Sequence, residues 1–164
     1  MQDYRCALGG CGAALEAGGG ANVVCSGCRA VVYCDVECQT AHWAAHMDGC
    51  FAAVVMRVHS GDVHQGDEGG EYVLRDRLQM WTKKLGASHE RTLICMGSLG
   101  KMMELQGKLA EAGELYRDRL AICRTAFDPT HKITLSSMND LALLLLAQGN
   151  LVEAVPLMRA ALKL

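Results

Sequence analysis

The last two thirds of the chain carry apolar residues at helical spacing, separated by short polar turns. In the clearest segment the apolar positions are Leu93, Met96, Leu99 and Met103. This spacing predicts an amphipathic helix over about residues 92–106, and Gly107 follows it where a glycine commonly ends a helix. A second helix is predicted over residues 109–127. Residues 128–130, Asp-Pro-Thr, then form a turn before the pattern restarts.

The pattern returns with a 42-residue period. When residues 89–122 are placed on residues 131–164, thirteen of the thirty-four positions carry the same residue. Self-similarity of this length is typical of stacked supersecondary units. We therefore predict an all-α helical-repeat solenoid over residues 71–164, beginning with a single helix near residues 72–85.

The predicted array ends on a strongly apolar segment, residues 160–164. A solenoid usually needs about three repeats and polar end caps. We therefore expect either that the chain is part of a longer protein or that this end associates with a second copy.

The chain before the repeats divides into two stretches. Residues 51–59 are apolar enough to prolong a helix that begins earlier, whereas residues 60–70 contain four glycines and are typical of a flexible connector. The predicted organisation is a cysteine-rich module over residues 1–50, a helix tail and glycine-rich linker over residues 51–70, and repeats over residues 71–164.

Cysteine is the unusual component of the composition. Seven of the nine cysteines lie between Cys6 and Cys50. The start of the sequence has no export signal and no run approaches the ~18 apolar residues of a membrane span, so we expect an intracellular protein of the cytosol, the nucleus or both. In a reducing compartment, clustered cysteines at short spacing indicate metal ligands rather than disulfides.

The candidate ligands fall into four close pairs: Cys6 and Cys11, Cys25 and Cys28, Cys34 and Cys38, His46 and Cys50. Eight such groups supply two closed tetrahedral zinc sites with no open position, so the metal is expected to be structural. If residues 37–50 are helical, Cys38 and His46 stand about 12 Å apart along the axis and cannot share one ion. Each helical pair must then join a loop pair, in an interleaved or a nested arrangement that spacing alone leaves open.

The run from Tyr33 to Cys50, together with Cys25-Ser26-Gly27-Cys28, resembles a MYND-type zinc finger. The resemblance covers about residues 6–50 and implies a small zinc-stabilised α+β finger with two zinc ions in the interleaved order. The ligand sets that it implies are Cys6, Cys11, Cys34 and Cys38 for the first ion, and Cys25, Cys28, His46 and Cys50 for the second. His42 continues the same helical ladder, but both sites are already complete, so we expect it on the helix surface.

Related fingers capture short proline-containing peptides as an added strand. Residues 30–33 are rich in β-branched side chains and predict a strand edge beside the helix. We therefore take Val32, Gln39 and Trp43 as candidate peptide-binding residues. The competing interpretation is that Val32 and Trp43 only pack in the interior.

The repeats resemble tetratricopeptide repeats of the longer kind found in kinesin light chains. The segments that carry this resemblance are Met138 to Ala142, Gln148 to Asn150, Glu153-Ala154 and Asp128 to His131. It implies a concave groove lined by polar residues, with Asn139 and Asp140 at groove positions, although the preceding repeat has Gly97 and Ser98 there. The alternative is that Asn139 and Asp140 only face water.

Charge bears on the function. The chain has a formal charge of −2, and residues 1–50 carry two basic and five acidic residues. Two zinc ions on seven thiolates bring that module to about −6 by counting, which disfavours phosphate binding. The sequence thus favours a non-enzymatic adaptor that binds peptide segments of other proteins, with no nucleic acid and no membrane. The alternatives are a fragment or relative of a MYND-containing protein-lysine methyltransferase, for which the connector leaves no room for a methyl-donor pocket, and a nucleic-acid-binding regulator.

Overall fold

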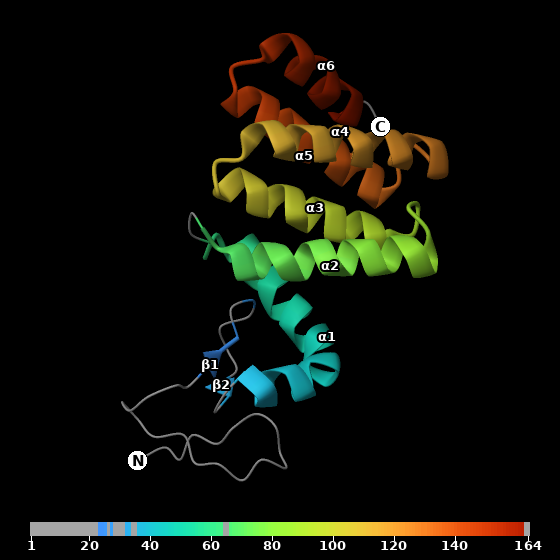
Figure 1. Ribbon diagram of the computed structural model, residues 1–164. Coiled ribbons are helices and arrows are strands. Elements are labelled where there is room, and N and C mark those ends of the chain that lie inside the picture. Colours follow the sequence, from blue (N-terminus) through green and yellow to red (C-terminus); the bar gives the residue numbers. More distant parts are fainter. Residues whose placement is uncertain (1–22, 26, 28–31, 34–35, 64–65, 163–164) are drawn as a thin grey trace.

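A computed structural model of the 164-residue chain describes residues 23–25, 27, 32–33, 36–63 and 66–162. Two short strands, β1 and β2, pair antiparallel with Val23 opposite Tyr33 and Val24 opposite Val32. The strands are β1 (Val23–Val24) and β2 (Val32–Tyr33); the helices are α1 (Val36–Ser60), α2 (Glu68–Leu85), α3 (Glu90–Leu105), α4 (Leu109–Ala126), α5 (Lys132–Ala147) and α6 (Leu151–Leu162). The helices from α2 onward form a stack, with the strands and the start of α1 below it (Figure 1).

The repeat seen in the sequence is also a structural repeat. Helix α5 begins and ends one sequence period after α3, and α6 begins one period after α4. One hydrogen bond repeats in the same register, since Gln106 Nε2 donates to the Asp67 carbonyl at 3.2 Å and Gln148 Nε2 donates to the Leu109 carbonyl at 3.3 Å. These paired features confirm the predicted helical repeat.

Helices α3 and α5 are each the first helix of a two-helix repeat, and we call them first-type helices. They begin and end in the same way. His89 and His131 are the N-caps, and their Nδ1 atoms accept from the amides two residues on. Gly107 and Gly149 have φ angles of 80° and 75°, the left-handed conformation that ends a helix at low cost for glycine. The glycine stop predicted after α3 is therefore present in both repeats.

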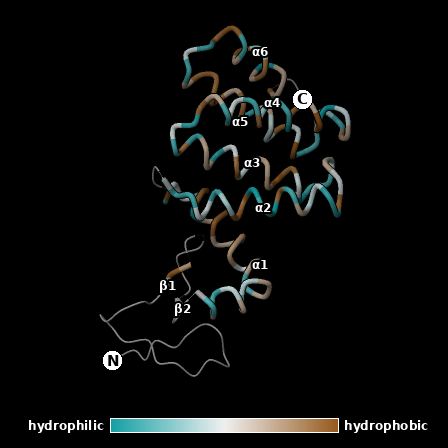
Figure 2. The backbone as a smooth tube through the Cα atoms, in the orientation of Figure 1, coloured by the Kyte–Doolittle hydropathy of each residue, from teal (hydrophilic) through white to brown (hydrophobic). Residues whose placement is uncertain are grey.

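Helix α1 belongs to both parts of the molecule. Shifting α3 back by one sequence period gives the range 48–63, and α1 runs through most of that range. Its buried residues Val54 and Val58 share a core cluster with Leu74 of α2 and Leu99 of α3. The later half of α1 packs on both α2 and α3, as α3 packs on α4 and α5. It thus stands where the first helix of an additional repeat belongs. In Figure 2 this part of α1 is brown where it adjoins α2, while the start of the helix is paler.

Part of the stretch expected to be a flexible connector is helical. Helix α1 continues to Ser60 and α2 begins at Glu68, so the glycines at 69 and 70 lie inside a helix. Gly70 is buried, and a Cβ there would lie 2.7 Å from the terminal methyl of Met102. Close helix contact, rather than chain flexibility, accounts for a glycine at this position.

No helix among the described residues is long and apolar enough to cross a membrane.

The main buried cluster runs from Cys25 and Cys50 in the finger to Ala154 in α6. The finger and the repeats therefore share one continuous core.

Replacing Gly100 by alanine is expected to lower the free energy of unfolding by about 1–3 kcal/mol, the usual cost of overpacking. A Cβ at this position of α3 would lie 2.4 Å from Cε1 and 2.8 Å from Cδ1 of Tyr116, a residue that is only 1% exposed. One period later the chain has Ala142 and Met158 at the equivalent positions. The double variant Gly100→Ala/Tyr116→Met should therefore recover part of the loss, as measured by urea unfolding.

Gly113→Ala is the matched control for this experiment. The nearest atoms to its added Cβ are the flexible Arg117 Nη1 at 3.3 Å and Leu144 Cδ2 at 3.5 Å. Alanine there should be tolerated and is favoured by helix propensity, by up to about 1 kcal/mol. Equal destabilisation of the two single variants would contradict the proposed clash.

Candidate metal centre and groove

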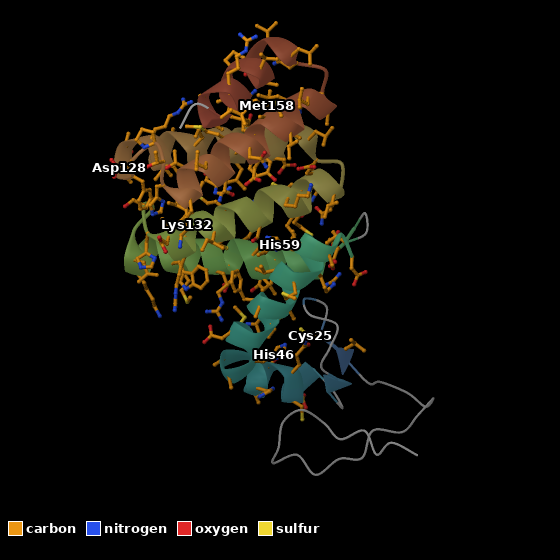
Figure 3. All side chains as sticks on the ribbon, turned by 180° about the vertical axis from the view of Figure 1, so that it is seen from behind. Cys25, His46, His59, Asp128, Lys132 and Met158 are labelled. Carbon is orange, nitrogen blue, oxygen red and sulfur yellow. The ribbon has the colours of Figure 1, made fainter. Side chains whose placement is uncertain are left out.

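The finger helix carries its ligand-type side chains at four-residue intervals. Cys38, His42, His46 and Cys50 therefore follow one another along neighbouring turns of α1. His46 is 7% exposed and Cys50 is fully buried, because that part of the helix faces the segment that contains Cys25. Figure 3 shows Cys25 beside His46 at the lower end of the molecule.

The three buried side chains converge on one point. Cys25 Sγ lies 3.7 Å from Cys50 Sγ and 3.4 Å from His46 Nε2, and the three ligand atoms all lie within 4.8 Å of one another. Zinc bonds of about 2.3 Å to sulfur and 2.0–2.1 Å to nitrogen at tetrahedral angles give ligand separations of about 3.8 Å and 3.6 Å. A disulfide would require about 2.05 Å between the sulfurs. The donor set and its spacing therefore fit zinc.

The surroundings of His46 favour the neutral form of its imidazole. Its pKa is lowered from the ordinary value, first by burial and second by the nearby His42. The neutral imidazole is the form that binds a metal. The ring of Trp43 lies 5.9 Å from that of His46 at a tilt of 54°, and the His42 ring stacks on it from the same helix.

The structure brings together three of the four ligands predicted for the second zinc ion, namely Cys25, His46 and Cys50. The fourth, Cys28, lies outside the described residues. Of the first predicted set, Cys38 is half-buried on α1 at the edge of the core, and Cys6, Cys11 and Cys34 lie outside the described part of the chain.

The candidate peptide-binding residues of the finger are only partly described. Gln39 and Trp43 are half-buried and, four residues apart, occupy one face of α1. Trp43 also packs against the core cluster. Val32 lies in β2, and its side chain is outside the described set.

A groove of about 390 Å³ lies along the first-type helices of the repeats. Its walls come from α1, α3 and α5, and its floor includes two residues of α4. The lining residues are Val58, His59, Ile94, Gly97, Ser98, Lys101, Glu104, Tyr116, Arg119, Ser136, Asp140 and Leu143. Of the two candidate groove residues, Asp140 lines this groove, whereas Asn139 is exposed and is not a lining residue. Figure 3 shows His59 at the end of α1 next to the repeats.

Gly97 has a role that the sequence pattern did not indicate. A Cβ at this position would lie 2.8 Å from Cζ of Arg119, so the glycine leaves space for the guanidinium. Arg119 Nη1 donates to Asp140 Oδ2 at 2.5 Å, and its side chain is only 5% exposed. Gly97 stands one period before Asn139 and has no polar side chain to offer the groove. At this point of the groove the polar group is the guanidinium of Arg119 from α4.

Sequence reasoning also missed three residues next to the metal centre: Arg57, Asp67 and the buried Gly27 between Cys25 and Cys28. No local motif distinguishes them, because their contacts join segments 10 and 30 residues apart. The only early indication was Arg57 itself, a single basic residue within an apolar stretch.

Comparison with known proteins identifies both parts. Residues 6–50 match the family model of the MYND finger, and residues 105–164 match that of the tetratricopeptide repeat. No curated protein matches the chain.

Two solved structures from Podosopora anserina, described as kinesin light chain nearly identical TPR-like repeats, resemble the chain. The first is 23% identical with a TM-score of 0.59, covering 68% of this chain and 51% of that one. The second, a point variant with the same description, is 23% identical with a TM-score of 0.60, covering 71% and 54%. The chain thus matches about half the length of each, and the likeness shows the fold.

The fold and the site define a zinc-finger protein with helical repeats. The finger is of the MYND type, and the repeats are tetratricopeptide repeats with the kinesin light chain-like fold. Both modules are ones that mediate protein–protein interactions.

Proposed function

We propose that this protein is a zinc-dependent adaptor that binds peptide segments of other proteins through its finger and through the groove of its repeats. The observation that carries the proposal is the groove itself, which has apolar and charged side chains within reach of an extended peptide. Its first wall is the same helix that holds the metal ligands His46 and Cys50.

Two structural zinc ions are part of this proposal. Cys6, Cys11, Cys34 and Cys38 hold one, and Cys25, Cys28, His46 and Cys50 hold the other. The spacing of Cys25, His46 and Cys50 supports the second assignment. These residues bind and orient the metal, which replaces the hydrophobic core that so small a module lacks. Together with the paired strands, they make the α+β finger.

The cysteines of the repeats support a non-catalytic role. Cys95 is fully buried and donates to the Leu74 carbonyl at 3.3 Å. Burial raises the pKa of its thiol to about 12, although the charge of Arg77 acts in the opposite direction. A thiol at that pKa is protonated at neutral pH and is a poor nucleophile.

The finger surface is proposed to bind a short proline-containing peptide across Val32, Gln39 and Trp43. The groove surface includes Asp140, with Asn139 at its exposed edge. Association through α6 stays a prediction; among the described residues of that helix, Val152 is 85% exposed and Leu162 is 86% exposed.

An NMR titration of the zinc-loaded protein with a proline-leucine peptide tests the finger surface. The chain has two tryptophans, so the indole resonances of Trp43 and Trp81 can be followed separately. Trp81 packs edge-on against Phe51, with ring centroids 4.8 Å apart, and is an internal control. We expect the Trp43 and Gln39 resonances to move while Trp81 stays, and Trp43→Ala to abolish binding. Unchanged Trp43 and Gln39 resonances at saturating peptide would refute this surface.

A further inference from the structure

Gly27, two residues after Cys25, packs against helix α2. Gly27 is buried, and a Cβ there would lie 2.7 Å from Val73 Cγ2 of α2 and 2.8 Å from Cys50 Sγ. The Gly69 carbonyl of α2 would lie 3.4 Å away. Gly27 is therefore enclosed between Cys50 on one side and α2 on the other.

Arg57 of α1 joins this loop to the start of α2. Its Nη1 donates to the Gly27 carbonyl at 2.7 Å, and its Nη2 donates to the carboxylate of Asp67. Its Nε lies 3.7 Å from Asp62 Oδ2. The Arg57 side chain is 11% exposed and that of Asp67 is 1% exposed, so solvent screens this pair weakly.

Asp67 continues the connection into the repeats. Its Oδ1 accepts from the Gly70 amide at 3.2 Å and so caps the N-terminus of α2. Its backbone carbonyl accepts from Gln106 Nε2 at 3.2 Å, just beyond the end of α3. A continuous set of polar contacts thus runs from the ligand loop through Arg57 and Asp67 to two repeat helices.

We propose that Arg57 is a positioning residue of the metal centre and couples zinc binding to the folding of the first repeat. Its guanidinium holds the Gly27 carbonyl, and with it the nearby ligand Cys25, against a support that the repeats supply. Coupling between two processes is reciprocal, so the repeats strengthen zinc binding and zinc binding in turn orders the start of α2. This inference rests on the zinc site of the proposed function.

Helix α1 also joins the two proposed interaction surfaces. Val58 and His59, directly after Arg57 in α1, line the groove of the repeats. The same helix carries Gln39 and Trp43 on its earlier turns. A partner that engages both surfaces therefore meets them at a separation set by this one helix.

The test compares zinc affinity in three full-length variants. Arg57→Met keeps the aliphatic stem and removes the donors to Gly27 and Asp67. Asp67→Asn keeps a good N-cap for α2 but removes the charge that holds Arg57. Arg75→Met is the matched control, because Arg75 lies on α2 in an ion pair with Glu71 and its side chain is 50% exposed.

Zinc affinity is measured by competition with a chromophoric chelator, and helix content is followed by circular dichroism. Loss of a residue that orients a metal ligand typically lowers affinity by about 10- to 100-fold. We expect losses of this size in Arg57→Met and Asp67→Asn, with helix content kept, and no loss in Arg75→Met. The absorption bands of bound Co²⁺ should change in the first two variants only, a result that general destabilisation does not produce.

Hydrogen exchange provides the reciprocal test. Chelation of zinc from the wild-type protein should speed exchange over residues 68–74 of α2, while α5 stays protected. Wild-type zinc affinity in both Arg57→Met and Asp67→Asn would overturn the coupling and leave the zinc site intact. A wild-type protein that binds no zinc would instead overturn the proposed function, and the coupling with it.

Discussion

Replacing Cys50 by alanine is expected to remove one equivalent of bound zinc and to unfold the finger, while helices α3 to α6 are kept. Cys50 is fully buried and its sulfur lies 3.7 Å from that of Cys25, within the three-residue cluster that also contains His46. A structural zinc site contributes on the order of 10 kcal/mol to the folding of a small module, and a closed site tolerates the loss of a ligand poorly. Elemental analysis after dialysis measures the zinc, and the NMR indole resonance of Trp43 reports the finger.

Cys123→Ala is the matched control for this substitution. Cys123 is equally buried, at 0% exposed, and its sulfur lies 3.3 Å from Ser137 Oγ in the repeats, away from the metal cluster. The same side-chain atoms are deleted, so both variants leave a similar cavity. We expect Cys123→Ala to lower overall stability but to retain full zinc content. A Cys50→Ala protein with wild-type zinc content would rule out the proposed ligand set.

Local features of the sequence were sufficient to predict the repeats and the helical pair of the metal cluster, His46 and Cys50. The helices of the repeats are predicted from apolar spacings within single segments of the chain. Gly107 and Gly149 end helices α3 and α5 through a backbone conformation that glycine adopts readily. His46 and Cys50 are one helical turn apart, so their shared face follows from helix geometry alone. The closure by Cys25 depends on distant parts of the chain. Ligand spacing left the interleaved and nested arrangements open, and only the resemblance to a MYND-type finger placed Cys25 with His46 and Cys50.

The helical part of the connector was not predicted, because composition does not distinguish two uses of glycine. Gly61 and Gly66 have positive φ angles and form turns, whereas Gly70 is helical and leaves space for Met102. The same ambiguity affected Gly97, where the missing side chain makes room for Arg119. In each case the deciding atom comes from a helix distant in sequence, so only the folded structure reveals the reason.

The role of α1 was hidden for a similar reason. The repeat comparison starts at residue 89, and shifting it back by one period reaches a segment that already serves the finger. The segment must hold His46 and Cys50 as well as the packing residues Val54 and Val58. Because α1 has to supply metal ligands as well as core residues, its sequence shows little similarity to α3 and α5. It still packs on α2 and α3 as the first helix of a repeat does.

Replacing Asp140 by alanine is expected to lower the free energy of unfolding by about 3–5 kcal/mol, the usual cost of leaving a buried charge without its partner. The side chain of Arg119 is 5% exposed, and its Nη1 is held by Asp140 Oδ2 at 2.5 Å. Its other contact through Nη2, to Ser136 Oγ, is long at 3.5 Å, and its Nε has no hydrogen-bond partner among the described residues. Little else is therefore available to stabilise the guanidinium once the carboxylate is gone.

Glu111→Ala provides the comparison, because Glu111 pairs with Arg75 at 3.4 Å while both side chains are about half exposed, at 55% and 50%. Exposed pairs of this kind contribute about 0–1 kcal/mol. Urea unfolding of the two variants should differ by several-fold in lost stability. The double variant Arg119→Met/Asp140→Ala should recover much of the loss, since an apolar side chain of similar length needs no counter-charge. If Asp140→Ala proves no more destabilising than Glu111→Ala, the guanidinium is reached by water in solution and the groove floor is open rather than closed.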